Sequence, residues 1–206
     1  MRGLRTKLAE CFISCLCENF DVLIFVETWL HPDIKDNEFI DNRYIVYRTD
    51  RSESNSTKSI GGGVLIAVKK NFQSSKMNLF SELEDLWVTL QINHKILIFC
   101  AVYLPPDISA ELYETYVNKV KSVCYNNLDS LIFILGDFNL AGVKWICDDE
   151  IIGLIPINIR SEKEILICDN FASYDLHQFN DGANCSGNIL DLCYSNCDNI
   201  VISTKH

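Results

Sequence analysis

The sequence predicts an α/β sandwich built from mixed β-sheets. Short apolar runs typical of buried strands occur along the whole chain, and two long amphipathic stretches have helical spacing. Consecutive strands are joined partly by tight turns and partly by helices, which favours mixed sheets over a purely parallel wound sheet. The 206 residues are expected to form a single domain, residues 1–206, since about 150 residues per domain is usual.

A helix followed by a buried strand is predicted at the N-terminal end. Apolar residues at helical spacing predict an amphipathic helix over residues 6–19, with Thr6 near its N-terminal cap. The apolar run 21–27 has the composition of a strand buried on both faces. Residues 44–47 are strand-like, and the serine-rich stretch 51–59 is expected to be an exposed loop.

Three consecutive glycines, residues 61–63, precede the next predicted strand, residues 64–68. Glycine lets the backbone turn sharply or approach another group closely. These glycines do not form a phosphate-binding Walker loop, because no Gly-Lys-Ser/Thr follows them and no helix begins there. Residues 86–92 and 95–103 are predicted to form a β-hairpin that turns at Asn93-His94.

The C-terminal half repeats the order of helix and then buried strand. An amphipathic helix is predicted over residues 109–127 and a strand over residues 131–135. A weaker helical pattern covers residues 161–172, and a last strand is predicted over residues 189–195.

The net charge limits the partners that the chain can bind directly. Eighteen Lys and Arg against 28 Asp and Glu give a net charge of −10 at pH 7. This balance argues against tight, metal-free binding of DNA or RNA, because phosphate contacts supply most non-specific affinity. It is compatible with a carboxylate site that reaches phosphate through a divalent cation. No membrane partner is expected, because the longest apolar run, residues 96–104, is far shorter than the roughly 20 residues of a membrane-spanning helix.

Ten cysteines are spread along the chain without any Cys-x-x-Cys pair. Several lie inside apolar runs, where a reduced cysteine packs as a small hydrophobic residue. Buried free thiols are therefore favoured over disulfides or a zinc site. An intracellular location, nucleus or cytoplasm, follows, and secretion is not expected.

Polar side chains stand at the ends of several predicted strands. Glu27, Tyr103, Asp137 and Asn139 each follow an apolar run, and Asp191 lies inside the last one. A carboxylate at such a place is costly unless it is paired or bound to a metal ion. Converging carboxylates form the hard oxygen site that Mg²⁺ prefers. Each residue taken alone also fits a plain structural role: Asp137 with Asn139 could form an Asx turn, and Glu27 could cap a loop.

Five sequence blocks stand in an order that resembles the endonuclease/exonuclease/phosphatase superfamily. The resemblance is strongest to the apurinic-type endonuclease domain of non-LTR retrotransposons and runs over nearly the whole chain. Residues 48–51 and 176–178 fit the same pattern. The five blocks are ETWL at 27–30, GGGVLIAVKK at 61–70, AVYLPP at 101–106, GDFN at 136–139 and GNILDLCYSN at 187–196.

The resemblance implies a deoxyribonuclease I-like fold, a four-layered α/β sandwich in which two packed mixed sheets are flanked by helices. It also implies a phosphodiesterase that depends on Mg²⁺, with Mn²⁺ as a possible substitute. Glu27 would be the principal metal ligand, and Asp137 would align or deprotonate the attacking water. Asn139 would hold a phosphate oxygen or that water, Tyr103 would contact the scissile phosphate, and Asp191 would orient a histidine.

The chain also departs from the family pattern at both ends. The family begins with a strand that ends in Asn, in a pattern like Asn-x-Arg-Gly-Leu, whereas here Arg-Gly-Leu begins at Arg2. The family ends with an Asp-His pair on a further strand, and His206 is not preceded by Asp. The chain is therefore expected to be an incomplete copy that lacks the family's first and last strands. Weak or no DNA nicking follows, because acid–base groups contribute about 10²–10⁴-fold to such rates.

Three functions stay open on the sequence alone. The first is a DNA endonuclease domain, followed in the intact element by a reverse transcriptase. The second is a phosphatase or phosphodiesterase of the same superfamily that acts on a lipid or a nucleotide. The third is a decayed or domesticated fragment that keeps the fold without catalysis.

Overall fold

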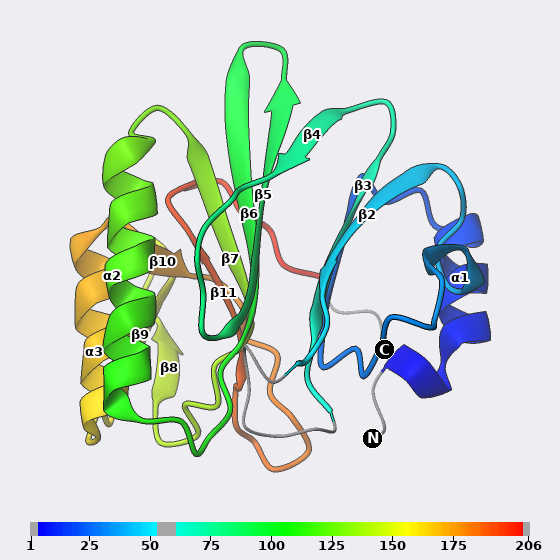
Figure 1. The fold of residues 1–206 in the computed structure, drawn as a ribbon. Helices are drawn as coiled ribbons and strands as arrows, with labels where there is room; N and C mark the ends of the chain where they lie inside the picture. The colour runs from blue at the N-terminus through cyan, green and yellow to red at the C-terminus, as the bar shows by residue number, and fades with distance from the viewer. Residues whose placement is uncertain (1–3, 53–60, 204–206) are drawn as a thin grey trace. The chain divides into compact units, whose positions relative to one another are not determined.

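The computed structural model describes residues 4–52 and 61–203, which fall into two compact units, Met1–Tyr103 and Leu104–His206 (Figure 1). Most of the predicted serine-rich loop lies outside the described residues. The expectation of a single domain stays a prediction.

The first unit begins with a helix beside a three-stranded antiparallel sheet. The strand order is β1-β3-β2, so β3 is the central strand. Strand β1 is confirmed, but it is half-buried, because it lies at an edge of this sheet. The elements in chain order are η1 (Leu4–Thr6), α1 (Leu8–Cys17), β1 (Val22–Val26), η2 (Asp36–Glu38), β2 (Tyr44–Thr49) and β3 (Val64–Lys69).

A second antiparallel group of strands completes the first unit. It contains β4 (Gln73–Lys76), β5 (Glu84–Ile92) and β6 (Lys95–Tyr103), paired in that order. The predicted hairpin is confirmed, and Asn93 takes the left-handed conformation, φ 55°, that its tight turn requires. Strand β4 was not predicted, because its polar sequence carries no apolar alternation and its pairing with β5 rests on backbone hydrogen bonds.

Alternation along β3 explains why this strand is apolar throughout. Leu65 and Ala67 pack in a cluster with Cys11 and Cys15 of α1. The residues between and beside them, Val64, Ile66 and Val68, pack in a cluster with Leu86, Val88 and Leu90 of β5. A strand covered on both faces must be hydrophobic at every position.

The second unit is a five-stranded group covered by two helices that lie side by side (Figure 1). Its strand order is β7-β11-β10-β9-β8, and every pair with a described register is antiparallel. The elements in chain order are α2 (Ala110–Asn126), β7 (Leu131–Asp137), β8 (Lys144–Cys147), β9 (Leu154–Ile157), α3 (Glu162–Ser173), β10 (His177–Gln178) and β11 (Asp191–Ser195).

Side-chain caps explain why the predicted starts of α2 and α3 agree with the structure to within one residue. The hydroxyl of Ser109 accepts a hydrogen bond from the N–H of Leu112 at the start of α2. Ser161 and Glu164 form a capping box at the start of α3. Thr6 lies near the start of α1, as predicted, but it ends η1, and the N-cap itself is Lys7, whose side chain makes no capping hydrogen bond.

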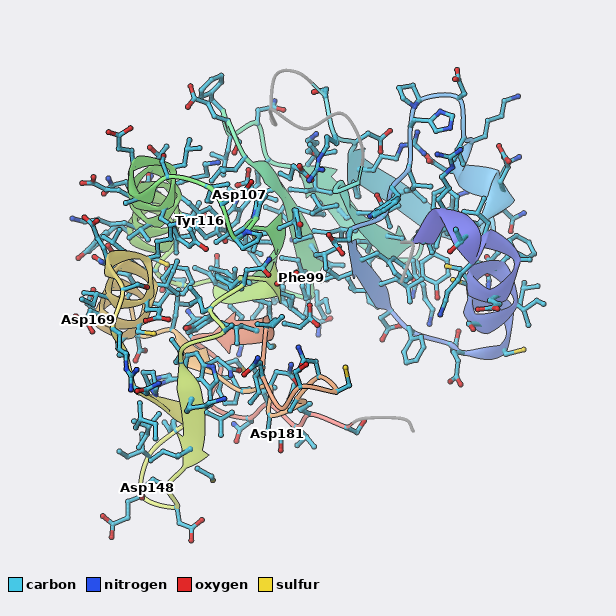
Figure 2. All side chains as sticks on the ribbon, turned by 90° about the horizontal axis from the view of Figure 1, so that it is seen from below. Phe99, Asp107, Tyr116, Asp148, Asp169 and Asp181 are labelled. Atoms are coloured by element: carbon cyan, nitrogen blue, oxygen red, sulfur yellow. The ribbon has the colours of Figure 1, made fainter. Side chains whose placement is uncertain are left out.

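An aromatic cluster fixes the loop after β7. Phe138 is fully buried and lies 5.6 Å from the ring of Tyr194 and 6.1 Å from the ring of Phe171. Tyr116, labelled on α2 in Figure 2, contacts the same Phe138 ring. The hydroxyl of Tyr113 donates to the Phe138 carbonyl at 3.0 Å, and burial, reinforced by the charge of Asp137, raises the pKa of Tyr113. The segment between Asp137 and Asn139 is thus anchored through its side chain and its backbone.

Three short strands of this unit were missed. Strands β8 and β9 form a hairpin around an acidic turn, with Asp148 at its tip (Figure 2). Pro156 and the acidic residues obscure the strand pattern there, since both are depleted in strands. Strand β10 has two residues, too few for any periodicity.

The predicted fold class is confirmed. In the first unit α1 packs on one face of a sheet and a second group of strands on the other, and in the second unit two helices cover a sheet. These are the layers of an α/β sandwich. Among the described helices, none has the length and apolarity needed to cross a lipid bilayer.

The expectation of thiols outside disulfides is confirmed, since none of the ten cysteines, all of them described, forms one. Only half are buried: Cys11, Cys15, Cys100, Cys168 and Cys193. Three others, Cys17, Cys147 and Cys185, are exposed.

Thiol labelling in the folded protein should separate these two sets. Burial raises the pKa of Cys168 to about 12 and that of Cys193 to about 11, and the reactive thiolate forms only as the pH approaches those values. N-ethylmaleimide at pH 7, followed by peptide mass spectrometry, should therefore modify Cys17, Cys147 and Cys185 first. Equal labelling of Cys168 without denaturant would contradict this packing.

Candidate functional site

The residues predicted from the sequence form two groups, one in each unit. Glu27 and Tyr103 belong to the first unit and follow or end strands β1 and β6. Asp137, Asn139 and Asp191 belong to the second unit, at the end of β7, in the loop after it and at the start of β11.

Glu27 occupies a strained turn directly after β1. Its φ is 52° and that of Trp29 is 57°, a left-handed conformation that costs energy for residues with a Cβ. Two backbone hydrogen bonds hold the turn: Thr28 N–H donates to the Gly63 carbonyl at 3.1 Å, and Trp29 N–H donates to the Gly62 carbonyl at 2.9 Å. Glu27 is half-buried, and its carboxylate has no hydrogen bond or ion pair with the described residues. The turn therefore presents a carboxylate that a ligand can use.

The triple glycine allows a close backbone approach, as the sequence predicts. All three glycines have positive φ, 87°, 66° and 80°. A Cβ at Gly62 would overlap the Glu84 carboxylate and the Arg51 guanidinium, and one at Gly63 would lie 2.7 Å from Thr28 Oγ1. Only glycine fits between the Glu27 turn and this ion pair.

Glu84 is the residue that sequence reasoning missed. It begins β5, is 1% exposed, and accepts hydrogen bonds from Arg51 Nε at 2.6 Å and from the Gly63 N–H. The Arg51 guanidinium lies over the Tyr103 ring, 5.7 Å from its centroid. Tyr103 is 8% exposed and directly opposite Glu84 across β5 and β6. The signal was a carboxylate next to an apolar run, but Glu84 precedes the predicted strand 86–92, whereas the residues predicted from the sequence follow an apolar run or lie inside one.

The Asx turn considered for Asp137 is present. Asn139 N–H donates to Asp137 Oδ1 at 3.0 Å, and Asn139 has φ 53°. The Asn139 side-chain amide donates to the Leu104 carbonyl at 3.0 Å. These two bonds fix the orientation of the Asp137 carboxylate and of the Asn139 amide, so the structural and the functional interpretation are compatible.

Asp137 and Asp191 lie side by side. They are register partners in the β7–β11 pair, and directly opposite residues of an antiparallel pair project from the same face. Asp137 is half-buried and Asp191 is exposed. Two carboxylates in this arrangement repel each other, and a cation bound to both would relieve the repulsion.

Comparisons with known proteins identify the fold of the chain. Neither the comparison with protein-family models nor that with curated proteins finds a match. Among solved structures, the endonuclease domain of TRAS1, a telomere-specific non-LTR retrotransposon, is 16% identical, with a TM-score of 0.62 over 93% of this chain and 80% of that chain. The human nocturnin catalytic domain with bound sulfate anion is 12% identical, with a TM-score of 0.59 over 93% and 74%. A protein of the endonuclease/exonuclease/phosphatase family from Leptotrichia buccalis is 13% identical, with a TM-score of 0.55 over 95% and 82%.

The chain has the endonuclease/exonuclease/phosphatase fold. The resemblance predicted from the five sequence blocks is thus confirmed at the level of the fold. The roles of the individual residues are not carried over by similarities of 12–16% identity and stay predictions.

In this fold, the residues present fit a hydrated ion better than a closed metal centre. Within residues 4–52 and 61–203, no three His, Cys, Asp or Glu side chains gather as a metal site. Mg²⁺ keeps several waters and is often held by only one or two carboxylates. The Glu27 carboxylate, which has no hydrogen bond or ion pair with the described residues, fits that requirement, and the adjacent carboxylates of Asp137 and Asp191 fit it as well.

Of the three described histidines, two contact an aspartate other than Asp191. His31 contacts Asp33 at 3.4 Å, and His177 contacts Asp175 at 3.3 Å. His94 is exposed in the β5–β6 turn, and His206 lies outside the described residues. The orienting role of Asp191 therefore stays a prediction.

Two glycine substitutions separate backbone strain from packing at the triple glycine. Gly62 and Gly187 both have positive φ, 66° and 76°, but a Cβ at Gly187 meets no atom within 4 Å. Gly187→Ala should cost about 1–2 kcal/mol of unfolding free energy, the strain of the left-handed conformation. Gly62→Ala should cost about 1–3 kcal/mol more, because the added methyl overlaps the buried ion pair. Urea unfolding of both variants measures the difference, and equal losses would contradict the close approach.

Proposed function

We propose that the chain is a metal-dependent phosphodiesterase, the DNA endonuclease domain of a non-LTR retrotransposon, with Mg²⁺ as its cofactor. The observation that carries the proposal is the pairing of Asp137 with Asp191 in register at the ends of β7 and β11. Two adjacent carboxylates, one of them oriented by an Asx turn, fit a site that binds a cation and positions a water.

The proposed roles follow from where each side chain is held. Glu27 holds the ion, because its carboxylate is presented by a strained turn. Asp137, fixed by its turn with Asn139, accepts the proton of the attacking water. The Asn139 amide and the Tyr103 hydroxyl would contact the phosphate, and Asp191 would orient a histidine. A bound Mg²⁺ would supply Lewis-acid stabilisation of the charge on the phosphoryl oxygens.

DNA as substrate is supported by the sequence blocks and by the similarity to the TRAS1 endonuclease domain. The net charge of −10 means that phosphate binding depends mainly on the cation, so DNA binding should be weak.

A second candidate is a phosphatase or phosphodiesterase that acts on a nucleotide or a lipid. The similarity to the nocturnin catalytic domain with bound sulfate favours keeping it, since sulfate and phosphate have the same tetrahedral shape and similar charge. Both enzymes would use the same carboxylates, so the choice between them rests on the substrate that is cleaved.

Calorimetric titration with Mg²⁺ tests the cofactor. The wild-type chain should bind Mg²⁺, and Glu27→Ala should remove that binding because it removes the proposed ligand. Glu114→Ala is the matched control, since Glu114 is an exposed carboxylate on α2. A wild-type chain that binds no Mg²⁺ would contradict the proposed enzymatic function and favour the hypothesis of a fragment that keeps the fold without catalysis.

Cleavage assays test the chemistry and the substrate. Supercoiled plasmid should be nicked slowly in Mg²⁺ and not in EDTA, and Asp137→Asn should lower the rate by about 10²–10⁴-fold, the usual contribution of a general base. Glu114→Gln should leave the rate unchanged. Cleavage of a nucleotide or phosphoinositide in place of plasmid would select the second candidate, and a rate insensitive to Asp137→Asn would refute the role given to this residue.

A further inference from the structure

Glu84 lies at the centre of a buried network next to the proposed site. It is 1% exposed, and the side chain of its partner Arg51 is 6% exposed. A buried carboxylate is costly unless other groups compensate it, and here Arg51 Nε at 2.6 Å and the Gly63 N–H do so. Both compensating groups belong to the first unit.

One branch of the network leads to Glu27. Glu84 accepts the Gly63 N–H, the Gly63 carbonyl accepts the Thr28 N–H, and the Gly62 carbonyl accepts the Trp29 N–H. Thr28 and Trp29 directly follow Glu27, whose left-handed backbone needs such support. The position of the Glu27 carboxylate thus depends on where Glu84 holds the glycines.

The other branch leads to Tyr103. Glu84 fixes the Arg51 guanidinium, and the guanidinium lies over the Tyr103 ring at 5.7 Å. A cation over a ring face is attracted by the ring's negative centre. One buried carboxylate therefore constrains both first-unit residues of the site.

We propose that Glu84 is a positioning residue, which holds Glu27 through the triple glycine and Tyr103 through Arg51. The inference rests on the proposed function only in taking Glu27 and Tyr103 as site residues. A buried ion pair is a poor means of stabilisation alone, because apolar residues of similar volume often replace it without loss. The role of the Glu84–Arg51 pair is to fix the positions of the Glu27 turn and of the Tyr103 ring.

Asp85 provides a matched control on the same strand. It follows Glu84, is 6% exposed, and accepts a 2.7 Å hydrogen bond from the indole N–H of Trp87. Successive residues of a strand point to opposite faces, so the side chains of Asp85 and Glu84 project from opposite faces of β5.

Amide hydrogen exchange tests the positioning without any metal. In Glu84→Gln, the amides of Thr28 and Trp29 should exchange about ten-fold faster or more, which corresponds to a coupling of about 1.4 kcal/mol. The amide of Val88, in the middle of β5, should not change. Asp85→Asn should leave Thr28 and Trp29 unaffected. Unchanged exchange in Glu84→Gln, or equal acceleration in Asp85→Asn, would overturn the proposal.

The double variant Arg51→Gln with Glu84→Gln covers the case in which the single variant does not fold. It removes both charges together and leaves no uncompensated buried ion. Faster exchange at Thr28 and Trp29 with protected β5 amides is again the expected result, and wild-type exchange would overturn the inference.

A Mg²⁺ titration of the same variants links the positioning to the site. Glu84→Gln should weaken Mg²⁺ binding about ten-fold while Asp85→Asn keeps wild-type affinity, a loss of the size that outer-shell substitutions cause. A wild-type chain without Mg²⁺ binding would refute the proposed function, whereas the exchange experiment would still decide the role of Glu84. Unchanged affinity in Glu84→Gln would overturn the link to Glu27.

Discussion

A carboxylate placed at the end of an apolar strand requires a positive partner, and this constraint organises the candidate site. Glu84 satisfies it internally, with Arg51 and a glycine N–H. Asp137 and Asp191 are register partners on one face of the β7–β11 pair, and Glu27 stands on a strained turn without a hydrogen bond or ion pair among the described residues. Glu84 supports the backbone next to Glu27, and the proposed role of the other three carboxylates is to act on a ligand. A divalent cation is the partner that fits hard oxygen ligands in this arrangement.

The elements that the sequence predicts well are those with a local physical signal. Serine caps mark the starts of α2 and α3, and Asn93 marks the turn of the β5–β6 hairpin. Strand β3 is apolar at every position because it is covered on both faces. Strands β4 and β10 carry no such signal: one is polar and the other has two residues, so their pairing depends on neighbours distant in the sequence. No local pattern could reveal them.

The residues of the candidate site also divide into those with a local sequence signal and one without it. Motif and strand-end reasoning selected Glu27, Tyr103, Asp137, Asn139 and Asp191, and the structure places each of them at or next to the end of a strand. The sequence could not show that the Asx turn and a catalytic role of Asp137 are compatible. That depends on which Asp137 oxygen accepts the hydrogen bond from the Asn139 N–H. Glu84 was missed because its importance lies in a long-range contact with Arg51 and the triple glycine. The three glycines predicted that the backbone approaches another group closely, but not which group.

The central claim is that the turn at Glu27 binds a divalent ion. Paramagnetic broadening by Mn²⁺, followed residue by residue in amide NMR spectra, measures this most directly, because Mn²⁺ broadens only nuclei near it. The amides of Glu27 and Thr28 should broaden at low Mn²⁺ concentration, Mg²⁺ should reverse the broadening, and Glu27→Ala should abolish it while Glu114→Ala leaves it unchanged. Amides of Glu27 and Thr28 that stay sharp in the wild-type chain would contradict the claim.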